Sequence, residues 1–210
     1  MMMVVMGCNS GGVSEGSQAK ATKAGGSVID LKVVGEKIKS AVEFAGKVKE
    51  VHTLVKSIDD IAKGIKKKIG ANGLKDDANG ANHHTPLLAG VFSVATTIEK
   101  KLGELQVTES LKGFLKGLDE KVKDVDTKAK AFTSKLKNQH ATLGAADGAA
   151  TDVNAKNAID KNDATGGKGK EELVALNTAI DTLLIDSKAI LNVVIAELTT
   201  KAVVTTGQSS

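Results

Sequence analysis

Cys8, the single cysteine of the chain, is the residue with the most definite chemistry. It follows the apolar run Val5-Met6-Gly7, and the chain becomes polar directly after it. A small residue between an apolar run and a cysteine is typical of a bacterial lipoprotein cleavage site, where the thiol receives a diacylglycerol and the peptide is cut before the cysteine. We therefore predict lipid attachment at Cys8, with residues 1–7 as the truncated remnant of a signal sequence. An incidental free thiol is the alternative.

Residues that could bind a metal or catalyse a reaction are few. His83 and His84 are adjacent, with Asp76 and Asp77 nearby in sequence, but neighbouring side chains on a loop rarely face one metal ion. The glycine-rich segment at residues 166–170 lacks the spacing of a phosphate-binding loop and any preceding strand. No serine lies in a nucleophile elbow. We therefore expect no metal, no cofactor and no enzymatic activity.

The composition argues against a nucleic-acid-binding protein. The chain contains no arginine, so all 29 basic residues are lysine, and aromatic residues make up only 2% of the sequence. Arginine and aromatic side chains are the usual means of reading bases and phosphates. The net charge of +4 therefore indicates a lysine-studded helical surface. Such a surface could still contact a sulfated polysaccharide or an anionic membrane with modest, salt-sensitive affinity.

A long apolar stripe dominates the N-terminal third of the chain. Between residues 27 and 70, apolar side chains recur in alternating steps of three and four, which places them on one face of an α-helix. Ser27 can cap the start of this helix, and Gly70 can end it in a left-handed conformation. We therefore predict one helix over residues 27–70, preceded by a flexible tether at residues 8–26 that begins with the acylated cysteine.

Further helices follow from the same spacing. Thr85 and Pro86 indicate the start of a second helix, and the most regular stripe of the chain, from Leu111 to Leu136, predicts a third. The remaining prediction is a short helix at 151–160, a long helix at 171–201, a tail at 202–210, and irregular segments at 70–85, 140–150 and 161–170. No stretch alternates with period two over a useful length, so no sheet is assigned, although a short hairpin within the loops stays open.

These elements predict an all-α fold, a four- or five-helix, mostly antiparallel bundle over residues 27–201 with long N- and C-terminal helices. The first helix carries apolar residues away from its main stripe, among them Phe44, Leu54 and Ile61. We interpret these three as the face that meets a second copy in a homodimer.

Several blocks together resemble a known family. They are CNSGG after Gly7, the stretch from Val33 to Gly64, the passage VFSVATTIEKKLGEL from Val91, and AKNAIDKND from Ala155. In order and spacing these are similar to the variable small proteins of relapsing-fever Borrelia, homologous to outer surface protein C of Lyme Borrelia.

The resemblance implies a helical homodimer that acylated Cys8 anchors to the external face of the outer membrane. It implies a serotype-defining antigen that is exchanged during antigenic variation, evades immunity, and contacts host or vector molecules, including a possible glycosaminoglycan. It places the exposed variable loops where host antibodies bind, at Asp76, Asp77, His83, His84, Asp147 and Lys168.

A second class of function stays open. An amphipathic helical protein that lies on membranes or carries lipid, without an antigenic role, would also be rich in lysine and poor in catalytic residues. Narrow stripes with charged flanks favour packing between helices instead. Binding of the protein without Cys8 to liposomes would favour the second class.

Overall fold

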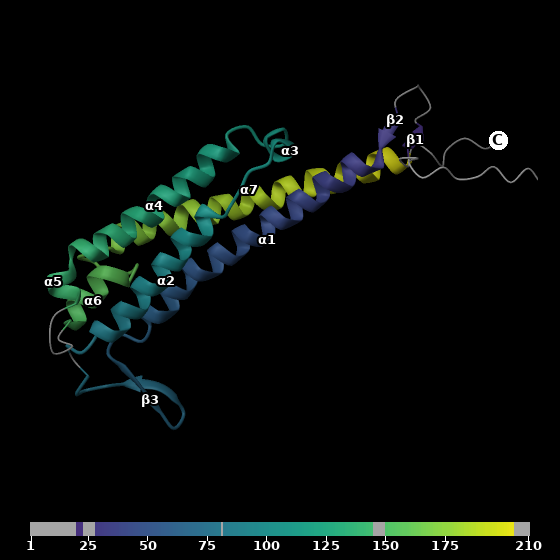
Figure 1. Ribbon diagram of the computed structural model, residues 1–210. Coiled ribbons are helices and arrows are strands. Elements are labelled where there is room, and N and C mark those ends of the chain that lie inside the picture. The colour runs from purple at the N-terminus through teal and green to yellow at the C-terminus, as the bar shows by residue number, and fades with distance from the viewer. Residues whose placement is uncertain (1–19, 23–27, 81, 145–149, 204–210) are drawn as a thin grey trace, which may run out of the picture.

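The computed structural model describes residues 20–22, 28–80, 82–144 and 150–203, and the fold is all-α, as predicted. Figure 1 shows an elongated rod in which two long helices run side by side and the other helices cover them. The helices are α1 (Leu31–Ala62), α2 (Thr85–Gly103), α3 (Glu109–Lys112), α4 (Leu118–Asn138), α5 (His140–Leu143), α6 (Asp152–Ile159) and α7 (Lys170–Val203). Two small hairpins pair β1 (Lys20–Thr22) with β2 (Val28–Asp30), and β3 (Lys67–Gly70) with β4 (Gly73–Asp76).

The core is the seam between α1 and α7, closed by α2 and α4. Val48, Val55 and Ile58 of α1 are completely buried, as the three- and four-residue steps of the first helix require. Helix α7 supplies a matching row that includes Leu173 and Ile180. Because aliphatic side chains fill this seam almost alone, the aromatic-poor composition is sufficient for a packed interior.

The two covering helices follow their predicted stripes. Pro86 lies in the first turn of α2, where its missing N–H costs nothing. Helix α4 buries a regular row from Leu118 to Leu136, and Phe132 within it is completely buried. The short helix α6 begins where Thr151 accepts a hydrogen bond from the backbone N–H of Asn154 at 3.0 Å, as its cap.

The predicted end of the first helix is wrong. Helix α1 stops at Ala62, and the chain turns at Lys66, whose φ of 59° is left-handed, into the hairpin β3–β4. Ile65 is still buried, whereas Ile69 is 88% exposed, so the apolar spacing continued beyond the surface that could bury it. Gly70 and Gly73 pair across the two-residue turn, and Gly73 has a φ of 107°. This turn chemistry overrides the helical period.

The third predicted helix is also divided, into α3 and α4. Gly117 has a left-handed φ of 77°, a conformation that cannot continue a helix. Leu111 before the break and Leu118 after it are both buried, so each segment still turns its apolar side to the core. The regular spacing across the break therefore reflects burial on both sides rather than one continuous helix.

Candidate recognition surface at the loop end

One end of the rod collects most of the segments for which the family resemblance predicts exposed, variable loops. We call it the loop end, comprising the hairpin β3–β4, the residues from 77 to 84, helices α5 and α6, and residues 160–169. The start of α1 and the end of α7 lie at the opposite end (Figure 1). Within the described residues, the predicted loops at 70–85 and 161–170 therefore lie together in space, although they are far apart in sequence.

Lysine–aspartate pairs brace the hairpin and its exit. Lys67 donates to Asp76 at 2.6 Å and Lys68 donates to Asp77 at 2.8 Å. These hydrogen bonds lower the pKa of Asp76 and Asp77 below their usual values. Asp76 is exposed, as predicted, whereas Asp77 is half-buried, because its oxygen also accepts from the backbone N–H of Asn79.

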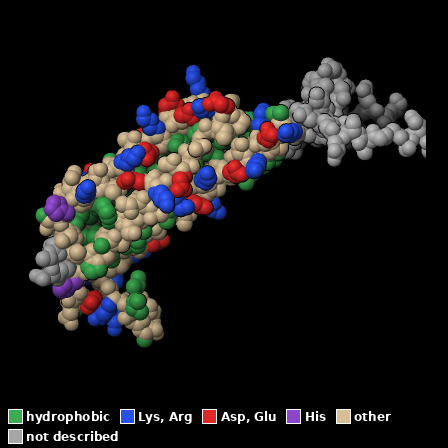
Figure 2. All heavy atoms as spheres, in the orientation of Figure 1, with side chains coloured by type: hydrophobic (Ala, Val, Ile, Leu, Met, Phe, Trp, Pro, Cys, Tyr) green, Lys and Arg blue, Asp and Glu red, His purple; other side chains and the backbone are tan. Residues whose placement is uncertain are grey.

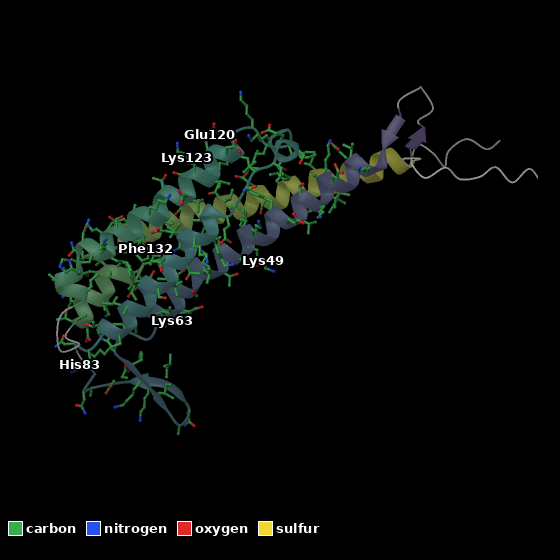
Figure 3. The ribbon with its side chains drawn as sticks, in the orientation of Figure 1. Lys49, Lys63, His83, Glu120, Lys123 and Phe132 are labelled. Carbon is green, nitrogen blue, oxygen red and sulfur yellow. The ribbon has the colours of Figure 1, made fainter. Side chains whose placement is uncertain are left out.

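His84 is not an exposed loop residue, which corrects the prediction. Its side chain is buried, and Nε2 lies 2.7 Å from Oδ1 of Asp152 at the start of α6. The same carboxylate accepts from the backbone N–H of Asn82 at 3.3 Å, and the backbone N–H of His84 donates to Ala150. His83, by contrast, is exposed at the loop end (Figure 3). The pair His84–Asp152 thus fastens the start of α2 to the start of α6.

The latch formed by His84 and Asp152 has a defined pH range. The hydrogen bond from His84 lowers the pKa of Asp152 below the usual value of 3.8. A carboxyl group with a lowered pKa in the folded chain stabilises the fold above its unfolded pKa, and that stabilisation is lost as the pH falls through the lowered value. The stabilisation that Asp152 contributes is therefore complete near neutral pH and is lost in acid, as the pH falls from the usual pKa of this carboxyl group through its lowered pKa.

Lys168 is only half-buried, whereas the prediction placed it on an exposed loop. Its ammonium group donates to the side chains of Gln139 at 3.3 Å and Thr142 at 3.2 Å, which ties the segment before α7 to the end of α4 and to α5. In this position the lysine braces the loop end rather than extending from it. Asp147, the remaining predicted loop residue, and Cys8, the predicted lipid-attachment site, lie outside the described residues.

The residues predicted for a dimer face differ in their exposure. Phe44 is 3% exposed and packs in the core of the monomer, so it is not part of a surplus apolar surface. Leu54 and Ile61 are half-buried against the same core. The well-exposed large apolar residues of α1 are instead Val42, at 51%, and Val33, at 46%. Phe44 was misassigned because the apolar stripe of α1 is wider than the steps of three and four that define its centre.

A polar cluster links α1 to α7 and was missed in the sequence. Nε2 of His52 lies 2.9 Å from Oδ1 of Asp181, and the other carboxylate oxygen accepts from Lys56 at 2.9 Å. Lys56 also donates to Asn177 at 2.8 Å. Because these partners lie more than a hundred residues apart in sequence, no local pattern could have revealed them. The cluster fixes the register of the two longest helices.

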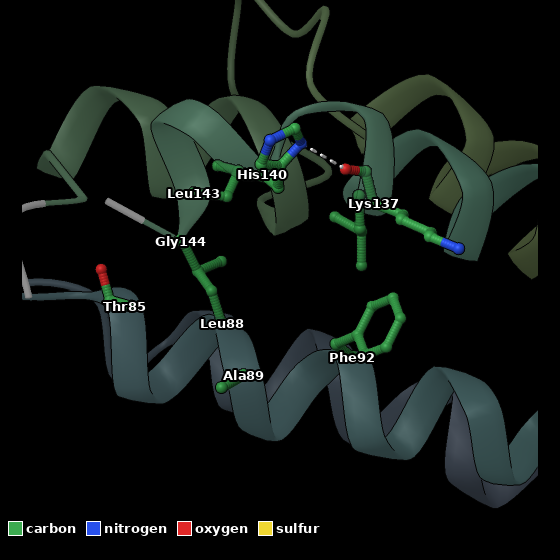
Figure 4. Close-up of a pocket in the computed structure, with 9 residues that line it drawn as sticks. Thr85, Leu88, Ala89, Phe92, Lys137, His140, Leu143 and Gly144 are labelled. Atoms are coloured by element: carbon green, nitrogen blue, oxygen red, sulfur yellow. Dashed lines mark hydrogen bonds between the residues drawn. The ribbon is translucent and has the colours of Figure 1, made fainter. Parts of the chain in front are cut away.

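A cavity of about 300 Å³ lies between α2 and the end of α4 with α5. Figure 4 shows Leu88 and Phe92 on one side and His140 and Leu143 on the other. The lining of the cavity is mainly apolar. Nδ1 of His140 lies within hydrogen-bond distance of the backbone oxygen of Lys137, at 3.1 Å. The cavity can accommodate a small apolar group, but it does not bring together a nucleophile, a base and an oxyanion site of the kind that catalysis requires.

Two properties of the described residues bear on the remaining classes of function. Over the residues that the structure describes, no three histidine, cysteine, aspartate or glutamate side chains gather closely enough to hold a metal ion. None of the described helices combines the length and the apolar character needed to cross a bilayer.

Comparison with known proteins gives the family. The Lipoprotein_6 family, described as lipoproteins, matches residues 28–204. Variable small protein 11 of Borrelia hermsii is 37% identical over 203 residues, which cover 96% of this chain and 94% of that protein. Outer surface protein C of Borreliella burgdorferi is 35% identical over 203 residues, which cover 96% of this chain and 91% of that protein.

A solved structure agrees with these relatives. Variable small protein 1 of Borrelia turicatae has a TM-score of 0.72 and 42% sequence identity, with 80% of this chain and 99% of that chain covered. The resemblance stated from the sequence is therefore confirmed. The chain belongs to the lipoprotein family of the variable small proteins and outer surface protein C.

Proposed function

We propose that this protein is a variable surface antigen, held on the external face of the outer membrane by lipid on Cys8. Its loop end faces the surroundings, where it meets host antibodies and host or vector molecules, and replacement of one variant by another evades immunity. The observation that carries the proposal is similarity over almost the whole chain to variable small proteins and outer surface protein C.

The geometry of the rod supports this orientation. The start of α1 and the end of α7 lie at one end of the rod, and the loop end lies at the other (Figure 1). The first of these ends is the one that continues along the chain toward Cys8, because α1 is the first helix. A tether at residues 8–26 that starts from acylated Cys8 would hold the first end close to the bilayer. The hairpin β3–β4 and the residues before α2 would then be the parts farthest from the membrane and most accessible to antibodies.

Protease treatment of intact cells tests this display. We expect a protease added outside the cells to degrade the protein while a periplasmic protein in the same cells survives. Antibodies raised against the segment from Lys67 to His83 should label unpermeabilised cells. Survival of the protein until the outer membrane is opened would contradict surface display.

The second part of the proposal is a homodimer that uses a different face of α1 from the one predicted. Gly35, Val42, Gly46 and Thr53 are exposed and fall on one line along the helix, opposite the core. A Cβ atom added at Gly35 or Gly46 would have no neighbour within 4 Å, so packing within the monomer does not require glycine there. Glycine inside a helix costs roughly 0.5–1 kcal/mol relative to alanine. Close approach of α1 from a second copy would compensate for that cost.

Gly46→Ala separates the effect of glycine on helix stability from its effect on association of two copies. We expect the substitution to raise the free energy of unfolding of the dilute monomer, by up to about 1 kcal/mol, because alanine favours the helix. The same methyl group should weaken association measured by sedimentation equilibrium, because it holds the two helices apart. Gly90→Ala in α2 is the matched control: its Cβ also meets nothing within 4 Å, so it should stabilise the monomer without affecting association. Equal association of the Gly46→Ala variant and the unaltered protein would contradict this face.

A further inference from the structure

The hairpin β3–β4 projects from the rod and exposes two large aliphatic side chains. Ile69 is 88% exposed and Leu74 is 63% exposed, and they are direct cross-strand partners. Figure 1 shows the hairpin projecting from the bundle, and Figure 2 shows apolar side chains on it. The core ends before the hairpin, since Ile65 is the last buried residue of this segment. Neither aliphatic side chain therefore contributes to the packed interior.

The hairpin has two unlike faces. Side chains alternate along a strand, so Lys67, Ile69, Leu74 and Asp76 share one face, and Lys68 and Lys75 oppose each other on the other. The stem of Lys75 lies over Gly70, where an added Cβ would come within 2.8 Å of its Cδ atom. Like charges directly opposite in a hairpin are unfavourable. The sequence nevertheless places two lysines there, on the face opposite the exposed aliphatic pair.

The charge of this element is unbalanced. Four lysines, at positions 66, 67, 68 and 75, accompany two aspartates, Asp76 and Asp77. The aspartates are paired with Lys67 and Lys68. Lys66 and Lys75 form no salt bridge with any residue that the structure describes. The hairpin thus carries net positive charge on the same two strands as its two aliphatic side chains, with Lys75 on the opposite face and Lys67 balanced by Asp76 on the aliphatic face. The partner that it fits is anionic and apolar at once.

An anionic phospholipid bilayer has both properties. Phosphate and carboxylate groups at its surface attract lysine, and the acyl boundary beneath them accepts aliphatic side chains. Lysine stems can extend so that their ammonium groups stay among the headgroups while Ile69 and Leu74 lie deeper. A sulfated polysaccharide would use the lysines alone and leave the aliphatic pair in water. We propose that the hairpin β3–β4 is a membrane-contact element that places Ile69 and Leu74 at the acyl boundary beneath the headgroups of an anionic bilayer.

This proposal rests on the proposed lipid anchor in one respect: the anchor decides which membrane the hairpin contacts. With lipid on Cys8, the hairpin would lie at the far end of the rod and would face an opposing membrane rather than the one that holds the tether. Many copies on one surface would raise a weak contact to useful strength. Binding to vesicles does not involve the anchor, so it can be measured whether or not Cys8 is acylated in cells.

The test uses the full chain with Cys8→Ser, so that no acyl chain contributes. We expect it to co-sediment with vesicles of phosphatidylcholine and phosphatidylserine, and not with phosphatidylcholine alone. Ile69→Ser with Leu74→Ser should lower the partition coefficient at least about tenfold. Lys66→Gln and Lys75→Gln should each lower it about fivefold. Added salt should weaken the binding of the unaltered hairpin.

Ile185→Ser is the matched control, because Ile185 is 68% exposed on α7, away from the hairpin, and its loss should leave vesicle binding unchanged. Circular dichroism should show equal helix content in all variants, since the hairpin lies outside the core. Vesicle binding that survives the Ile69 and Leu74 substitutions would overturn the proposal. So would binding to heparin without binding to vesicles, or a change in self-association as the sole effect of those substitutions.

Discussion

Cys8→Ala is expected to abolish retention of the protein in the outer membrane while the helices stay folded. Lipoprotein acylation attaches a diacylglycerol to a cysteine sulfur, and Cys8 is the single cysteine of the chain. None of the described helices could replace the lipid by spanning the bilayer. Two or three acyl chains give stable anchoring, whereas a protein without acyl chains has no lasting attachment to the membrane. Fractionation of cells that carry the gene with a complete signal sequence measures the effect.

The matched control for this substitution is Ser10→Ala, two residues beyond the cysteine. It should leave the protein in the membrane fraction, because it removes a hydroxyl that takes no part in acylation. The released Cys8→Ala protein should have the circular dichroism of the unaltered one. An undiminished amount of Cys8→Ala protein at the cell surface would refute the anchor.

Leu118→Asp is expected to be the most destabilising single substitution considered, at roughly 4 kcal/mol or more of unfolding free energy. Leu118 is 1% exposed at the start of α4, so a carboxylate there would be taken from water without a partner. The loss of aliphatic packing adds to that penalty. Urea unfolding followed by circular dichroism measures it.

Thr127→Asp provides the control on the same helix. Thr127 is exposed, so a carboxylate there remains in water and should change the unfolding free energy by no more than about 0.5 kcal/mol. A melting temperature for Leu118→Asp equal to that of Thr127→Asp would mean that the row from Leu118 to Leu136 is not part of the core.

The sequence was most informative where local spacing and burial agree. The apolar steps of α1, α2 and α7 predicted their existence, because each helix buries one continuous side against the same seam. Thr85 and Pro86 marked the start of α2 correctly to within a residue, because the effect of proline in a first turn is local. The short helix predicted at 151–160 likewise begins within one residue of α6.

Prediction failed where local signals conflict. From Lys66 to Gly70 the apolar period continued although the core had ended, and the glycines of the turn decided the outcome. In α3 and α4 the left-handed conformation of Gly117 interrupted a perfect stripe. Spacing records which side chains are buried, and it does not record whether the backbone between them is continuous.

The exposure of the predicted loop residues followed from the sequence for some of them and not for others. The segments around Asp76 and His83 do lie exposed at the loop end. His84 was placed among them, but its partner Asp152 is 68 residues away in sequence, and only the fold brings the two together. Phe44 likewise looked like surplus surface until the width of the α1–α7 seam was known.

The most direct measurement of the central claim is the intact mass of the protein recovered from the surface of cells. An anchored surface antigen predicts a chain that begins at Cys8 and is heavier than that polypeptide by a diacylglycerol and an amide-linked acyl chain. The added mass should remain on the peptide that contains Cys8 after digestion. A surface-recovered protein with the unmodified polypeptide mass would contradict the account.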